Sequence, residues 1–123
     1  MKNLTKKEEE IMSFFWTQGP MQVKDIQDLY KNPKPHVNTI STLIRILEDK
    51  GFVGHEPVGK AYKYYALVSK DNFKKDTLKK VINKYFNNSY LGVVSTLVEE
   101  EKISLEDLKQ LVEKVEGAHR NKK

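Results

Sequence analysis

The sequence of 123 residues contains no cysteine. The chain therefore forms no disulfide, offers no cysteine ligand to zinc or to an iron–sulfur cluster, and has no thiol nucleophile. It also lacks an apolar run near the roughly 20 residues that cross a membrane, and its N-terminus lacks the apolar stretch of a signal peptide. These absences predict a cytoplasmic protein without membrane insertion.

Residue patterns that support catalysis or metal binding are absent as well. His36, His55 and His119 have no metal-ligand spacing to one another or to nearby carboxylates. No glycine-rich phosphate loop follows a predicted strand, and the acidic runs 8–10 and 99–101 are interpreted as solvated charge on helices. We therefore predict that the protein is not an enzyme and has no metal site and no cofactor.

Charge and hydrophobic content restrict the possible functions and the size of the core less strictly than the absences above. Twenty-two basic and 17 acidic residues give a net charge of +5, which permits nucleic-acid binding without requiring it. Hydrophobic residues make up 38% of the chain, enough for only a small core. A chain this short that forms two lobes buries little in each of them, so a partner chain is expected.

Three helices are predicted in the first half. Thr5 and Glu8 form a capping-box pattern at the start of a helix that ends at Gly19-Pro20. A second helix runs from Val23 to about Tyr30, before the prolines of segment 32–35, which a helix cannot include. The third spans Val37–Lys50, and Gly51 lies where a glycine ends a helix. Its apolar stripe is Ile40, Leu43, Ile44 and Leu47.

A β-hairpin is predicted next, from strand-like segments 52–56 and 61–67 around the turn signal 57–60. Three helices and a hairpin are the plan of a winged helix-turn-helix. The remainder has helical apolar stripes. We expect a mainly α fold with a small hairpin wing, comprising a DNA-binding domain over residues 1–70 and a helical dimerisation domain over 71–123, with a frayed basic tail from Gly117.

The helix predicted over Val37–Lys50 is the candidate recognition helix. Its apolar stripe would fix it on the first two helices. Short polar side chains near its N-terminus, followed by an arginine, would then face outward, with no acidic group among them to repel DNA phosphates. The alternative is an ordinary amphipathic helix whose polar face is solvated. The predicted DNA-contacting residues of this helix are Asn38, Thr39, Ser41, Thr42 and Arg45.

The wing would add lysines that contact backbone phosphates, Lys60 at its tip and Lys63 on its second strand. For Lys63, a solvent-facing strand lysine is an equal alternative. His36 is interpreted as an exposed loop histidine in preference to a phosphate contact.

Three wing tyrosines offer faces on which single-stranded bases could stack. Alternation along the strand places Tyr62 and Tyr64 on one face and Tyr65 on the other. Packing of one pair against the helices is the favoured interpretation.

The apolar stripes after Leu78 predict self-association. A helical fragment of about 50 residues cannot hide all of them within itself, whereas two interlocked copies can. Folding back onto the winged helix as a monomer is the alternative. A two-fold dimer would place its recognition helices about 34 Å apart, or a multiple of this, on an inverted-repeat operator. The predicted dimerisation residues are Leu91, Val94, Leu97, Val98, Leu105, Leu108, Leu111 and Val112.

Several segments, in this order and spacing, resemble the penicillinase-repressor family (BlaI/MecI/CopY). They cover nearly the whole chain and are Leu4–Trp16, Thr39–Phe52, Tyr62–Leu67, Phe86–Ser89 and Leu97–Leu108. The resemblance implies a dimeric winged-helix repressor that binds an inverted-repeat operator. It also implies that Thr39, Ser41 and Thr42 face DNA. In the β-lactam branch of the family, a membrane sensor with a metalloprotease domain triggers cleavage of the repressor in its dimerisation region.

The chain departs from the family pattern at three places. The copper branch has a C-terminal cysteine cluster, which is missing here, so copper sensing of that kind is not expected. The Asn-Phe bond at which the well-known members are cut corresponds to Thr96-Leu97, which leaves proteolytic control open. The family's Arg-Leu near the end of the recognition helix corresponds to Ile46-Leu47, and Arg45 lies about 100° around the helix from that arginine.

The sequence thus predicts a homodimeric repressor that binds double-stranded operator DNA, with a membrane sensor or protease as a further candidate partner. A winged-helix module for protein interaction is the alternative, since a fold does not fix a function. A regulator that binds a small molecule between its two lobes is the third interpretation.

Overall fold

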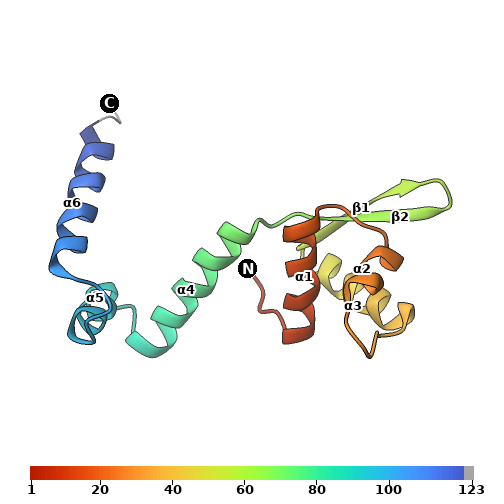
Figure 1. Cartoon of the computed structure of the whole chain (residues 1–123), viewed down its shortest axis with the longest axis horizontal. Helices are drawn as coiled ribbons and strands as arrows, with labels where there is room; N and C mark the ends of the chain where they lie inside the picture. The colour runs from red at the N-terminus through yellow and green to blue at the C-terminus, as the bar shows by residue number, and fades with distance from the viewer. Residues whose placement is uncertain (121–123) are drawn as a thin grey trace. The chain divides into compact units, whose positions relative to one another are not determined.

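The computed structural model describes residues 1–120 and contains, over that range, six helices and a two-stranded hairpin. The elements are labelled in Figure 1. The predicted fold class is therefore confirmed. The elements are α1 (Lys6–Gln18), α2 (Val23–Leu29), α3 (Val37–Asp49), β1 (Val53–Val58), β2 (Ala61–Ala66), α4 (Lys70–Phe86), α5 (Tyr90–Glu99) and α6 (Leu105–Arg120).

The chain divides into two compact units, Met1–Asp76 and Thr77–Lys123. The division lies within α4, six residues beyond the boundary predicted from the sequence. The reason is that Phe73 belongs to the first unit: its ring lies 5.4 Å from the ring of Trp16 and 6.0 Å from that of Phe52. Trp16 also donates its indole N–H to the carbonyl of Val68 at 2.9 Å.

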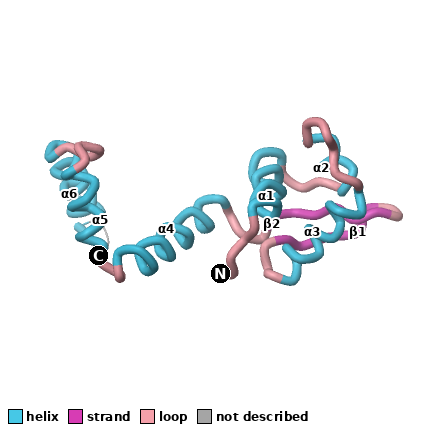
Figure 2. Tube along the Cα trace, turned by 90° about the horizontal axis from the view of Figure 1, so that it is seen from below, coloured by secondary structure: helices cyan, strands magenta, loops and turns pink. Residues whose placement is uncertain are grey.

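The core of the first unit joins all of its elements. Helices α1, α2 and α3 each bury one face, and β1 adds its first residue. β1 lies next to α3 and β2 next to α1, as Figure 2 shows. Burial of these side chains is the main contribution to the stability of the unit. The buried apolar residues are Ile11, Met12, Phe15, Met21, Ile26, Ile40, Ile44, Leu47, Phe52 and Val53.

The hairpin is antiparallel and closes at Gly59 and Lys60. Val58 pairs with Ala61, and Gly59 has φ 62°, a conformation that favours glycine. Met21 adds a short extended piece, because it exchanges backbone hydrogen bonds with Tyr64 at 2.9 and 2.8 Å. The predicted hairpin is confirmed, but its turn is shorter than the predicted segment 57–60, because Pro57 and Val58 belong to β1.

Helix α1 begins as predicted, but Glu8 does not have the role that the sequence indicated. The Thr5 hydroxyl accepts from the Glu8 N–H at 3.2 Å. Glu8 is buried, at 2% exposure, and its carboxylate accepts from the Lys50 ammonium at 2.5 and 2.9 Å. The interpretation of Glu8 as solvated charge was wrong, because the fold brings Lys50 to it from the end of α3.

Local caps define the ends of the helices in the second unit. Asn87 and Asn88 both have positive φ and end α4. The Ser89 hydroxyl then accepts from the Gly92 N–H at 3.0 Å and starts α5. The Ser104 hydroxyl accepts from the Asp107 N–H at 3.0 Å, while the Asp107 carboxylate accepts from the Ser104 N–H at 3.2 Å. This reciprocal pair caps α6.

The predicted frayed tail is only partly within the described residues. Helix α6 continues through residues 117–120, so this part is helical. The remaining residues of the predicted tail, 121–123, lie outside the described residues. Within residues 1–120, no helix has the length and apolar character to cross a membrane.

Candidate nucleic-acid interface

Helix α3 presents a polar stripe opposite its buried stripe. Asn38, Thr42 and Arg45 are exposed and follow one another at helical spacing, while Ile40, Ile44 and Leu47 are buried. The Thr42 hydroxyl donates to the Asn38 carbonyl at 2.9 Å. Arg45 lies near enough to Tyr64 to affect its titration electrostatically. These three side chains form the part of α3 most free to meet a partner.

The other two predicted residues of α3 lie to either side of this stripe. Thr39 is exposed and lines a pocket on the side of α1 and the α2–α3 loop. Ser41 is half-buried and faces the wing, where it lines a second cavity of about 350 Å³. The predicted set therefore spreads over three sides of the helix.

His36 caps the N-terminus of α3, a role that the sequence analysis missed. Its Nδ1 accepts from the Asn38 N–H at 3.1 Å. Histidine is not among the preferred capping residues, so this cap has only a weak signature in the sequence. The cap leaves the side chain at the edge of the polar stripe.

The two predicted wing lysines have different surroundings. Lys60 is exposed at the tip of the hairpin. Lys63 is half-buried and pairs across the strands with Glu56. Strand alternation places Lys63 on the face opposite Tyr62 and Tyr64. Lys60 is therefore the freer of the two cations.

The tyrosines of the wing divide as alternation predicts, but only one of the pair packs on the helices. Tyr64 lies against the core, and burial, followed by the charge of Glu48, raises the pKa of its hydroxyl. Tyr62 is 53% exposed, with its ring 4.9 Å from that of His55. His55 also binds the Glu48 carboxylate through Nδ1 at 2.5 Å and so links the wing to α3.

The cavity beside Ser41 brings in residues that the sequence analysis did not select. Gln22 and Lys24 from the start of α2 line it together with Tyr62. Their signal in the sequence is weak, because a polar residue at a helix start is common on any protein surface. Their position beside Ser41 adds them to the candidate interface.

The residues predicted to pair two chains are largely exposed in the single chain. Leu91 is 83% exposed and Leu105 is 69% exposed, whereas Leu97 and Leu108 are half-buried. Of the described residues from Thr77 onward, only Ile82 among the hydrophobic side chains is buried. The second unit thus exposes most of its large apolar surface. The other members of the predicted set are Val94 and Val98 on α5 and Leu111 and Val112 on α6.

In the part of the chain that the structure describes, no three His, Asp or Glu side chains come together as a potential metal site.

Comparisons with known proteins place these features in context. The model of the penicillinase repressor family matches residues 4–117. MecI, a methicillin resistance regulatory protein of Staphylococcus aureus strain N315, is 28% identical over 109 residues, which are 88% of this chain and 89% of MecI. A penicillinase repressor of Bacillus licheniformis is 23% identical over 117 residues, which are 94% of this chain and 91% of that protein.

Among solved structures, the chain is similar to the transcriptional regulator Tm0710 of Thermotoga maritima. Its alignment covers 95% of this chain and 78% of that chain, with 19% sequence identity and a TM-score of 0.48.

Proposed function

Because the chain belongs to the penicillinase repressor family, a family of DNA-binding transcriptional repressors, we propose that it acts as a homodimer on an inverted-repeat operator. The observation that carries the proposal is the division of α3 into a buried stripe and an exposed polar stripe of Asn38, Thr42 and Arg45. Such a helix can lie in a major groove without losing its packing on the domain. Thr39 and Ser41 then reach the edges of the same contact.

Homodimerisation is supported by the exposed apolar side chains of α5 and α6. Exposed apolar side chains that gather into a large patch mark an interaction surface in soluble proteins. A second copy can cover it with an identical surface around a two-fold axis. The two α3 helices would then read two half-sites, which explains why the proposed operator is an inverted repeat.

Arg45→Ala is expected to weaken operator binding by about 1–3 kcal/mol if the guanidinium reads a base. Arg45 is exposed on the polar stripe and can donate two hydrogen bonds to a guanine. Fluorescence anisotropy with operator DNA measures the loss, and Lys102→Ala in the second unit is the matched control. Unchanged affinity would remove Arg45 from the interface.

Salt dependence separates a repressor from a winged-helix module that binds another protein. Phosphate neutralisation makes the logarithm of affinity fall linearly with the logarithm of salt concentration. Lys60→Ala is expected to lower the magnitude of that slope by about 1, and to weaken binding to all DNA sequences alike. Lys63→Ala should change the slope less. Lys63 lies on the opposite face of the hairpin from Tyr64, and its cross-strand partner is the acidic Glu56. A flat salt dependence of the unaltered protein would contradict DNA binding.

The remaining part of the proposal is that cleavage of the repressor relieves repression. The partner in this step is a protease under the control of a membrane sensor. The candidate bond, Thr96–Leu97, lies inside α5. Cleavage there would divide the apolar surface of the second unit between two fragments and release the dimer. Mass spectrometry of the protein from induced cells is expected to show a fragment that ends at Thr96. Full-length protein alone under induction would contradict this route.

A further inference from the structure

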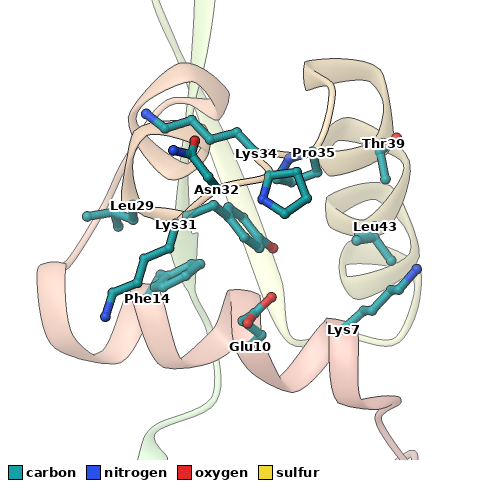
Figure 3. Close-up of a pocket in the computed structure, with 12 residues that line it drawn as sticks. Lys7, Glu10, Phe14, Leu29, Lys31, Asn32, Lys34, Pro35, Thr39 and Leu43 are labelled. Atoms are coloured by element: carbon teal, nitrogen blue, oxygen red, sulfur yellow. The ribbon is translucent and has the colours of Figure 1, made fainter.

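A pocket of about 710 Å³ lies in the first unit, apart from the polar stripe of α3. Its walls come from α1, the α2–α3 loop and the N-terminal half of α3, and Figure 3 shows their side chains. This volume is within the range of small-molecule sites. Only Thr39 belongs both to the pocket and to the proposed operator contact.

The floor of the pocket combines aromatic and aliphatic surface with one oriented carboxylate. Phe14 and Tyr30 meet edge to face, with ring centroids 5.0 Å apart. The Tyr30 hydroxyl hydrogen-bonds to Glu10, and burial together with this carboxylate raises the pKa of Tyr30 to about 12. The tyrosine therefore remains a neutral donor and holds the carboxylate in place. A carboxylate has about four lone-pair sites, so Glu10 can accept further hydrogen bonds.

The rim of the pocket carries cations. Lys7 projects from α1, and Lys31 and Lys34 project from the loop. Lys34 has a carboxylate neighbour, since its ammonium lies 3.6 Å from Asp28. Within residues 1–120, Lys7 and Lys31 form no ion pair. The rim can therefore bind an anionic group.

These charges restrict the ligand. A purely anionic ligand would meet the Glu10 carboxylate, and a purely cationic one would meet the lysines of the rim. We propose that the pocket binds an apolar zwitterion, an α-amino acid with a large side chain. Its ammonium would donate to Glu10, its carboxylate would accept from Lys7 or Lys31, and its side chain would pack on Phe14 and Leu43.

The site has a direct route to the recognition helix. Thr39 and Leu43 belong both to α3 and to the pocket wall. A ligand that contacts these residues shifts the position of α3 to the extent that it binds one position more tightly than another. This part of the inference rests on the proposed repressor function, whereas binding of the ligand itself does not.

The test uses the full-length protein without DNA and three matched probes. L-Phenylalanine carries both charges, 3-phenylpropionate lacks the ammonium, and phenethylamine lacks the carboxylate. Titrations followed by amide NMR are expected to show saturable binding of L-phenylalanine with shifts at Thr39 and Leu43. Each one-charge probe should bind roughly tenfold more weakly, because one charge-assisted hydrogen bond is lost.

Two variants make the assignment specific. Glu10→Gln should weaken the binding of L-phenylalanine roughly tenfold and leave the affinity for 3-phenylpropionate nearly unchanged. Glu9→Gln, at the neighbouring exposed position of α1, is the matched control. Equal affinity for all three probes, absence of saturable binding, or shifts away from the pocket would overturn the proposal.

A final arm measures operator affinity with and without L-phenylalanine. A change that Glu10→Gln abolishes supports the coupling to α3. Binding of the ligand to a protein that fails to bind any operator would overturn the repressor function and leave the pocket assignment standing. Operator binding without ligand binding would overturn the pocket assignment and leave the repressor function standing.

Discussion

Leu97→Asp and Leu108→Asp are each expected to make the protein monomeric and to abolish tight operator binding. Both side chains belong to the predicted dimer surface, and a carboxylate buried between two chains without a partner is strongly unfavourable. A monomer contacts only one half-site at a time, and losing the second contact lowers affinity by roughly 10²–10⁴-fold. Sedimentation equilibrium and operator titration measure the two effects.

Controls distinguish loss of pairing from loss of folding. Leu97 and Leu108 are half-buried within their own chain, so aspartate there also weakens the unit itself. Leu91 is 83% exposed, so Leu91→Asp is expected to weaken the dimer with little effect on the fold of the chain. Gln110→Asp, at an exposed polar position of α6, should leave the dimer unchanged. Intact dimers of both Leu97→Asp and Leu108→Asp would contradict the proposed surface.

Lys50→Ala is expected to lower the free energy of unfolding of the first unit by about 3 kcal/mol, because it leaves Glu8 buried without its partner. The Lys50 ammonium donates to both carboxylate oxygens of Glu8 and, at 2.9 Å, to the Asn3 carbonyl. The Glu8 side chain is 3% exposed and that of Lys50 is 23% exposed. Water therefore reaches the lysine end of the pair more readily than the carboxylate.

Urea unfolding measures this loss, with Lys6→Ala at an exposed position of α1 as the control. The double variant Glu8→Leu, Lys50→Met should recover much of the stability, since it removes both charges and fills the space with apolar atoms. A change below about 0.5 kcal/mol for Lys50→Ala, the range of ordinary surface substitutions, would show that the pair contributes little.

Local patterns in the sequence were enough to predict the elements of the fold. The spacing of Ile40, Leu43, Ile44 and Leu47 predicted the apolar stripe of α3, in which all but the partly buried Leu43 are buried. The same helical periodicity determined which polar residues face outward. Gly59 marked the turn of the wing. Each of these features depends on residues within a few positions of one another, which is the range over which periodicity and turn propensities act.

Contacts between distant segments could not be predicted in this way. Glu8 and Lys50 are 42 positions apart, and the capping pattern at Thr5 suggested a local role for the glutamate. The cavity beside Ser41 combines the start of α2 with the wing. The pocket at Glu10 combines three segments, each unremarkable alone. Residues of these kinds become candidates only when the packing of the elements is known.

The most direct test of the account is a hydroxyl-radical footprint of the protein on the DNA upstream of its own gene, at two salt concentrations. A dimeric repressor is expected to give a two-fold-symmetric footprint with two protected major grooves whose centres lie about 34 Å apart or a multiple of this. Affinity should be nanomolar and should fall steeply with salt. Weak protection spread evenly along the DNA, without symmetry, would contradict the claim that this chain is a dimeric operator-binding repressor.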